Sequence, residues 1–318
     1  MNLASYYGAL GASLPLLGAS HWCLLGTIST EDRCLGVANE LKSASHLDKA
    51  TMLRIRDIRE GERHTTLREK HARLFRRQIP NGIISPESSI ALSLKEMKKL
   101  YVDATTGFSE CVALDISTMP KAYFFPILKW ILEDNRFKDV VVLYTKALQY
   151  TDDMLAADVG AWMPIQPFSE SDDSDVNLLV VAAGFMPFGL PELVKEEYGR
   201  IEVKYLFPVP PGPPTYQRSW GFMQSINDSR TINRDQIVQV SAHDAYATFK
   251  ALERVCTNLN PVLAPYGSKP VSLGMALYAI SSKCSAYYTQ PSYYHPDYSS
   301  GIGESVLYPV KLEGMYLY

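Results

Sequence analysis

The sequence predicts an α/β protein built from two Rossmann-like halves, each with a parallel sheet. Apolar runs of strand length alternate with amphipathic stretches of helix length, which is typical of parallel α/β sheets. The apolar runs are nearly continuous in Val, Leu and Ile, which indicates strands covered on both faces. The alternation stops once, in a polar and acidic stretch, and then resumes. We therefore expect a first half over 1–150, a linker or mobile loop over 151–175, and a second half over 176–318.

The first half is expected to contain four strands joined by helices. Strands are predicted over 21–28, 51–57, 111–117 and 140–145. Helices are predicted over 31–41, 63–78 and 121–136, with Pro126 either kinking the last one or marking its first turn. We expect strands 111–117 and 140–145 to be parallel neighbours, because one helix connects them.

The second half repeats this pattern. Its strands are predicted over 176–185, 200–207, 236–241, 261–267 and 286–290. Its helices are predicted over 190–198, 244–259 and 268–283.

Composition narrows the class of protein. A hydrophobic content of 47% and a charged content of 20% are ordinary for a soluble globular protein. The net charge of −3 gives no reason to expect non-specific binding to nucleic acid or to an anionic membrane. The five cysteines are odd in number and lack CxxC spacing, so we expect buried free thiols in preference to a metal site or disulfides. We expect no cofactor. Without an unbroken apolar run of spanning length, the expected location is the cytoplasm.

Polar side chains follow the strand predicted over 111–117. Asp115, Ser117, Thr118 and Lys121 lie where this strand ends and the next helix begins. In open parallel sheets, ligands bind at the carboxyl ends of strands, where helix N-termini offer unpaired N–H groups and partial positive charge. Hydroxyls there cap the helix or donate to an anion, and a lysine adds a charge suited to phosphate.

A similar arrangement follows the strand predicted over 261–267. Gly267 ends this strand, Ser268 and Lys269 come next, and Pro270 falls in the first helical turn. The glycine would let the backbone approach a ligand closely. An ordinary helix start has the same residue types, so capping alone is the alternative at both strand ends.

The segment YGSKPVSLGMAL around this second strand end resembles the signature of CARF domains, which runs roughly Gly-Gly-Thr-Lys-x-Met. Gly267, Ser268 and Lys269 match its Gly-Thr-Lys core, whereas Tyr266 stands for the first glycine and Val271 for the methionine. A chain with two such halves is similar in outline to SAVED domains. The resemblance implies a nucleotide or cyclic oligonucleotide ligand, a role in prokaryotic anti-phage defence, and an effector protein or a homo-oligomer as partner.

The stretch 54–77 is the densest basic region of the chain. It contains Arg68, Arg73, Arg76 and Arg77 among several carboxylates. A solvated helix carrying ion pairs four residues apart is one interpretation. A docking surface for nucleic acid or an acidic partner is the other.

The Tyr-rich stretch 287–303 has two interpretations as well, base stacking or packing over the sheet edge. No catalytic motif is present, and His243 and His295 are more simply explained as hydrogen-bonded histidines. The first hypothesis is therefore a non-enzymatic nucleotide sensor or regulatory subunit. The alternatives are an enzyme that cleaves a nucleotide or nucleic acid in the same cleft, and a structural subunit of a defence complex.

Overall fold

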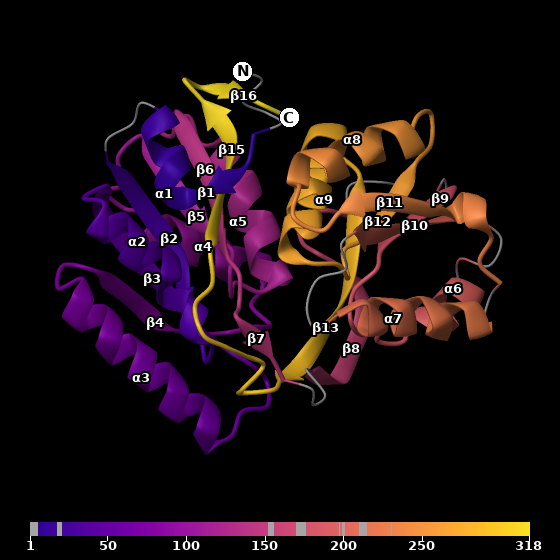
Figure 1. Cartoon of the computed structure of the whole chain (residues 1–318), viewed down its shortest axis with the longest axis horizontal. Coiled ribbons are helices and arrows are strands. Elements are labelled where there is room, and N and C mark those ends of the chain that lie inside the picture. The colour runs from indigo at the N-terminus through magenta and orange to yellow at the C-terminus, as the bar shows by residue number, and fades with distance from the viewer. Residues whose placement is uncertain are drawn as a thin grey trace. The chain divides into compact units, whose positions relative to one another are not determined.

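The computed structural model describes residues 6–17, 21–151, 156–169, 176–196, 198, 201–209, 215–229 and 231–318. The chain forms two compact units, each built on its own sheet (Figure 1). The first unit consists of Met1–Asp158 and Ser292–Leu317, and the second of Val159–Pro291 with Tyr318. Both are α/β, as predicted.

These units revise the boundaries expected from the sequence. The last part of the chain returns to the first unit, where β15 (Ser305–Leu312) pairs antiparallel with β6 (Asp139–Thr145). Every residue of β15 is buried, which explains why this run belongs inside a sheet. The expected linker contains β8 (Ala156–Pro164), which borders β13 (Ser285–Tyr294) in the second sheet. Positions 152–155 and 170–175 of that linker lie outside the described residues.

The first sheet has the strand order β1-β15-β6-β5-β2-β3-β4. Its strands from β6 to β4 are parallel, and their order in the chain gives the doubly wound pattern 3-2-1-4-5. The predicted parallel pairing of β5 with β6 is confirmed. The remaining bounds are β1 (Gly8–Ala9), β2 (Trp22–Ile28), β3 (Leu47–Arg56), β4 (Ile83–Ser89) and β5 (Cys111–Asp115). Outside this path, β16 (Met315–Tyr316) pairs with β15, and β7 (Gln149–Tyr150) pairs with β14 (Ser299–Ser300).

Helices cover both faces of the first sheet. On one face, Val37 and Leu41 of α2 and Phe75 of α3 pack on Trp22 and Leu24 of β2. On the other face, α5 is so thoroughly apolar that ten of its residues are buried, and Pro126 lies inside it. Ser93 and Glu96 form a capping box at the start of α4. The bounds are α1 (Leu10–Ser13), α2 (Gly36–Ser43), α3 (Glu62–Gln78), α4 (Leu94–Ala104) and α5 (Lys121–Glu133), with short 3₁₀ turns at Leu14–Leu17 and Asp32–Leu35.

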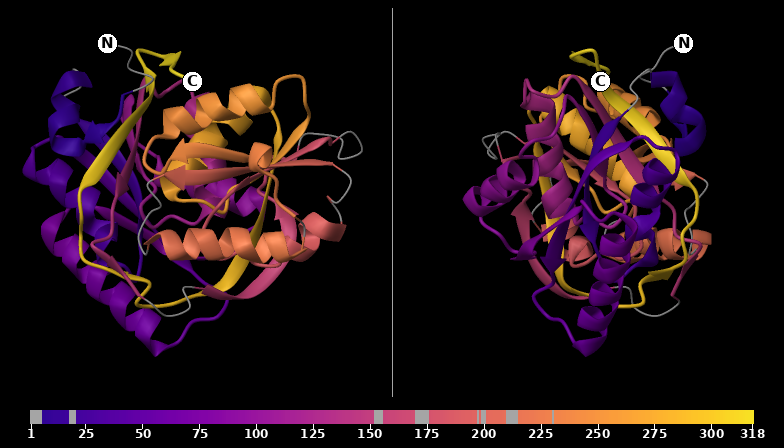
Figure 2. Two further views of the ribbon diagram at one scale, coloured as in Figure 1. Left: turned by 45° about the vertical axis from the view of Figure 1, so that its right-hand side comes forward. Right: turned by 90° about the vertical axis from the view of Figure 1, so that its left-hand side faces the viewer.

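The second sheet has the strand order β11-β10-β9-β12-β13-β8. From β11 to β13 its strands are parallel and again follow the pattern 3-2-1-4-5. Figures 1 and 2 show α8 and α9 on one face of this sheet and α6 and α7 on the other. The bounds are β9 (Leu178–Ala182), β10 (Glu202–Val209), β11 (Ile237–Ser241), β12 (Pro261–Ala264), α6 (Leu190–Glu196), α7 (Thr215–Ser229), α8 (Ala245–Val255) and α9 (Lys269–Ser282), with a 3₁₀ turn at Arg234–Gln236.

Candidate functional site

Each unit has a topological switch point, which is the place where the strand order reverses direction. It lies between β2 and β5 in the first sheet and between β9 and β12 in the second. Ligands of doubly wound proteins bind outside the carboxyl ends of the strands at such points. The segment 115–121 follows β5 and the segment 265–269 follows β12, so both predicted strand ends lie at the switch point of their own sheet.

In the first unit, Asp115 and Ser117 hold neighbouring strands together. One carboxylate oxygen of Asp115 accepts hydrogen bonds from the backbone N–H of Ser117, at 2.9 Å, and from its hydroxyl. The Ser117 hydroxyl in turn accepts from the backbone N–H of Thr145, at 2.7 Å, at the end of β6. Both side chains are at most 2% exposed. The polar atoms named here therefore connect β5 to β6.

Replacing Ser117 by Ala is expected to lower the free energy of unfolding by about 1–3 kcal/mol, because buried polar groups of Thr145 and Asp115 would each lose a partner. Chemical denaturation of the purified protein measures this loss. Ser43→Ala is the control, since Ser43 is exposed at the end of α2. A loss no larger than the control's would contradict the structural role of Ser117.

Thr118 and Lys121 follow Ser117 in the same turn. The Thr118 hydroxyl is 2.7 Å from that of Thr27, which lies near the end of β2, and this contact joins the two strands at the switch point. Lys121 is the first residue of α5 and is only 8% exposed. Of the four residues predicted in the first unit, these two remain candidates for contact with an anion.

A returning segment of the chain, residues 292–304, crosses the carboxyl ends of strands in the first unit, and we call it the C-terminal strap. The backbone N–H of Tyr294 donates to the carboxylate of Asp57, just after β3, at 3.2 Å. The carbonyl of Tyr294 lies 2.8 Å from Nε2 of His64 on α3. At this position the backbone of the Tyr-rich stretch is therefore bound to the first unit.

The strap also contacts the turn that follows β2. The hydroxyl of Ser299 donates to the carboxylate of Glu31, and the backbone N–H of Gly301 donates to that of Asp32 at 3.2 Å. Burial alone would raise the pKa of Asp32, but the hydrogen bonds from Gly301 and His71 hold it below its usual value. Polar groups of this turn therefore bind the chain's own C-terminal segment.

A buried ion pair supports the same turn. Arg33 contacts Glu31 at 2.9 Å, and its guanidinium also lies 5.7 Å from the ring centroid of Tyr144 and 5.8 Å from that of Tyr150. Burial would lower the pKa of Arg33, but the neighbouring carboxylate of Glu31 raises it well above the ordinary value. The pair joins two residues of the turn between β2 and α2, and Arg33 also donates to the carbonyl of Thr145 at the end of β6, at 3.4 Å.

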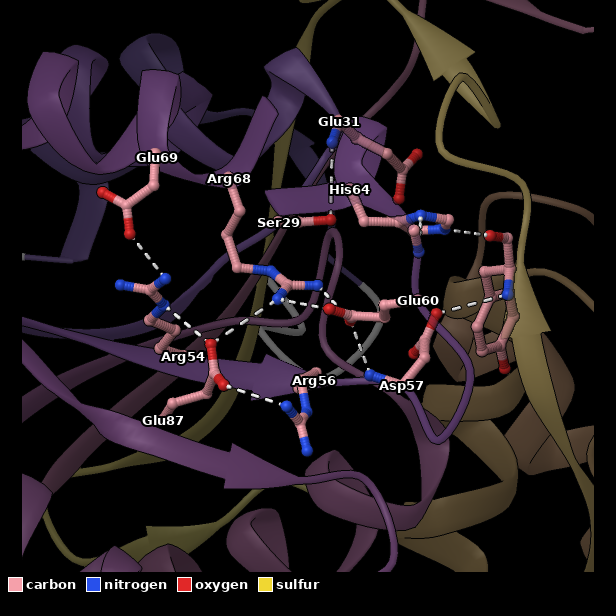
Figure 3. Close-up of polar contacts among 12 residues, drawn as sticks. Ser29, Glu31, Arg54, Arg56, Asp57, Glu60, His64, Arg68, Glu69 and Glu87 are labelled. Atoms are coloured by element: carbon pink, nitrogen blue, oxygen red, sulfur yellow. Dashed lines mark hydrogen bonds and ion pairs between the residues drawn. The ribbon is translucent and has the colours of Figure 1, made fainter. Parts of the chain in front are cut away.

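A second charge network lies at the ends of β3 and β4 (Figure 3). Arg68 on α3 is buried and forms an ion pair with Glu60, at 3.0 Å between Nη1 and Oε2. Arg54 on β3 pairs with Glu69 of α3 and with Glu87 of β4. These pairs join the helix to the sheet.

This network changes the predicted docking surface. Arg68 points inward and is neutralised by Glu60, so it does not belong to that surface. Arg73 and Arg77 are exposed on the side of α3 opposite Arg68, and Arg76 is exposed beside them. Sequence alone did not separate them, because the partner of Arg68 lies outside the helix.

In the second unit, glycines let two turns pack tightly at the switch point. A Cβ atom on Gly184 would lie 2.1 Å from the carbonyl oxygen of Tyr266, and one on Gly267 would lie 3.0 Å from the Cβ of Ala182. Gly267 is buried, and its close approach is to the end of β9. The stretch AAGFMPFG at 182–189 also follows a predicted strand, and its glycines are typical of a tight turn, but local pattern does not show that this turn packs against Tyr266.

Ser268 and Lys269 begin α9 and are both half-buried. The Ser268 hydroxyl donates to the carbonyl of Ala242, at 3.0 Å, at the end of β11. It therefore does not cap its own helix, and within the described residues no side chain caps α9. By contrast, the neighbouring helix α8 is capped by Asp244, which accepts from the backbone N–H of Ala247 at 2.9 Å.

Aromatic rings surround the residue that precedes this turn. The ring of Trp162 stacks on those of Tyr266 and Tyr287, with centroids 6.4 Å and 5.5 Å apart. The Tyr266 hydroxyl donates to that of Thr289 at 2.8 Å. Tyr266, which precedes the turn, is thus anchored to β8 and β13.

Two kinds of feature are absent from the part of the chain that the structure describes, a metal centre and a membrane-spanning helix. No group of three or more His, Cys, Asp or Glu side chains there is arranged to hold a metal ion. No helix there has both the length and the apolar character needed to cross a membrane. The five cysteines are free thiols.

No protein-family model matches the sequence, and no curated protein matches it. Among solved structures, the chain is similar to a functionally unknown protein from Pseudomonas aeruginosa PAO1. The two share 12% sequence identity, over 86% of this chain and 94% of that one, with a TM-score of 0.25. A likeness of this strength assigns no activity to the chain.

Proposed function

We propose that this protein is a nucleotide-binding sensor or regulatory subunit that binds a phosphate of its ligand at the start of α9 and acts with a separate effector. The observation that carries the proposal is the turn Gly267-Ser268-Lys269 at the switch point of the second sheet. Its helix has no side-chain cap among the described residues, and a lysine is its first residue.

This turn has the chemistry that an anion requires. A helix N-terminus carries partial positive charge and backbone N–H groups directed at a ligand. Lys269 adds a full positive charge that is half-buried and so less screened by solvent than an exposed one. Asp244 makes the neighbouring α8 N-terminus less attractive to an anion, because its carboxylate already occupies that position.

The first unit supports a ligand less well. Asp115 and Ser117 are bonded to each other and to β6, and the strap takes the carboxylates of Glu31 and Asp32. The proposal therefore assigns ligand binding to the second unit, with Thr118 and Lys121 as the remaining candidates in the first.

The ligand class follows from the resemblance of the turn to the CARF signature. That resemblance makes a cyclic oligonucleotide the first ligand to test, and a prokaryotic anti-phage system the proposed setting. Linear nucleotides are the second class, because the same turn chemistry suits any phosphate.

Lys269→Ala is expected to weaken nucleotide binding about ten- to a hundredfold, because a charge-assisted contact is typically worth about 1.5–3 kcal/mol. Calorimetric titration of cyclic and linear nucleotides into wild type and variant measures the effect. Lys195→Ala is the matched control, since Lys195 is exposed on α6 of the same unit and should leave affinity unchanged.

Two outcomes would contradict the proposal. If wild-type protein binds none of the nucleotides, the protein is not a nucleotide sensor. If wild type and Lys269→Ala bind a nucleotide with equal affinity, the ligand does not bind at the start of α9. Chromatography of the titrated ligand adds a separate test, because ligand recovered in cleaved form would favour the enzyme.

A further inference from the structure

The C-terminal half of α3 presents a surface of positive charge. We call its exposed cations the α3 basic face: Lys70, Arg73, Arg76 and Arg77. At 3.6 residues per turn, they project away from the side of α3 that carries the buried His64, Arg68, His71 and Phe75.

The arginines of this region divide into two groups by their partners. Arg54, Arg63 and Arg68 each lie against a carboxylate, from Glu69, Asp297 and Glu60 respectively. Arg73, Arg76 and Arg77 make no ion pair or hydrogen bond with any described residue. Within the basic face, only Lys70 has a carboxylate nearby, with Asp32 at 3.6 Å.

We propose that the α3 basic face is a docking surface for the phosphate backbone of a nucleic acid. Three guanidinium groups without carboxylate partners are available for bidentate contact with phosphate oxygens. From Lys70 to Arg77 the face extends about 10 Å along the helix, which is enough to follow consecutive phosphates of one strand.

The character of the surface selects nucleic acid over an acidic protein. Protein interfaces have an apolar or aromatic centre that is poor in charge. None of the large exposed hydrophobic side chains of the described residues lies on α3. The face is polar and mostly positive, with Glu69 as the carboxylate between its cations and already paired with Arg54. Such a surface is characteristic of nucleic-acid interfaces. Cations in the last turn of a helix are stabilised by the helix dipole, which explains Arg76 and Arg77 without a ligand. Arg73 lies one turn earlier, so the dipole does not explain it.

The test compares two double variants by fluorescence anisotropy with a labelled DNA duplex and a labelled single strand. Arg73→Gln/Arg77→Gln removes two charges spaced four residues apart on α3. Lys95→Gln/Lys99→Gln removes two charges with the same spacing on the exposed face of α4 in the same unit. Neither pair belongs to the proposed nucleotide site, so this test is independent of that site.

The arginine variant is expected to bind the duplex about tenfold more weakly at low salt, and the slope of log K against log salt should fall by about 1.8, since each lost phosphate contact removes about 0.9. The lysine variant should bind as wild type does. No binding by wild type at about 50 mM salt, or equal weakening by both variants, would overturn the proposal. Competition by polyglutamate as strong as that by the duplex would also overturn it, in favour of an acidic protein partner.

Discussion

Replacing Arg33 by Met is expected to lower the free energy of unfolding of the first unit by about 3–5 kcal/mol, because it leaves a buried carboxylate without its counter-ion. Arg33 is 4% exposed and Glu31 is 9% exposed, so water cannot replace the lost partner. The substitution also removes the guanidinium from Tyr144 and Tyr150. Methionine has a side chain of similar volume, so the lost stability comes mainly from the missing charge and not from a cavity.

The measurement is denaturation followed by tryptophan fluorescence. Trp22 and Trp130 lie in the first unit, so a background with Trp162→Phe and Trp220→Phe makes the signal specific to it. The control, Arg136→Met, breaks an ion pair of similar length, 2.7 Å to Asp134, but its side chain is 50% exposed. Exposed pairs contribute about 0–1 kcal/mol.

A double variant separates the charge from the contact. Glu31→Gln/Arg33→Met removes both charges and should regain part of the stability lost in Arg33→Met. If Arg33→Met costs no more than Arg136→Met, the buried pair does not support the turn after β2.

Much of the fold follows from local pattern. The predicted strands at 21–28, 140–145 and 261–267 overlap β2, β6 and β12, because buried parallel strands are continuous apolar runs that need no partner to be recognised. Both α3 and α9 begin within a residue of their predicted starts. The repetition of one strand order in two sheets also agrees with the prediction of two halves.

Other elements depend on partners distant in the sequence. The run at 305–312 is apolar, but Pro309 argues against an interior strand, and only the structure shows that the register of β15 shifts beside it. The polar sequence of β4 reads as a loop until β3 is placed next to it. The return of the chain to the first unit depends on the pairing of β15 with β6, which the local sequence pattern does not reveal.

The candidate site residues were also only partly predictable from the sequence. Position was predictable, since Ser117 and Lys269 both follow strands that end at a switch point. The direction in which each side chain points was not predictable, because it depends on partners elsewhere in the chain. Ser117 bonds to Thr145 on β6, and Arg68 pairs with Glu60, which lies outside α3. The expected ion pairs four residues apart on α3 were wrong for Arg68, which pairs with Glu60 over a turn of the chain.

The pH dependence of stability is expected to show the cost of burying Asp57. Burial is the largest cause that raises the pKa of this carboxyl, from 3.8 to about 6, and the negative charge of Glu60 adds to it. The hydrogen bond from the Tyr294 backbone and the charges of Arg68 and His64 act in the opposite direction but do not restore the usual value. In the folded protein, Asp57 therefore keeps its proton to higher pH than in the unfolded chain.

Proton binding by Asp57 determines whether stability rises or falls with pH. Between about pH 4 and pH 6 the folded state holds more protons at this site, so the contribution of Asp57 to stability is complete below this range and is lost as the pH rises through it. The full difference corresponds to at most about 3 kcal/mol, because one pKa unit equals about 1.36 kcal/mol. Partial exposure of Asp57 reduces the expected value below this limit.

Asp57→Asn tests this directly, because an amide oxygen still accepts from the Tyr294 backbone but carries no charge. At pH 7 the variant should be more stable than wild type by up to about 3 kcal/mol, and near pH 4 the two should be equal. Denaturation in the same tryptophan background at both pH values measures the difference, with exposed Asp103→Asn as the control. If the difference in free energy of unfolding between wild type and Asp57→Asn stays constant across this range, Asp57 has an ordinary pKa. In that case the contact with Tyr294 of the C-terminal strap does not desolvate the carboxylate.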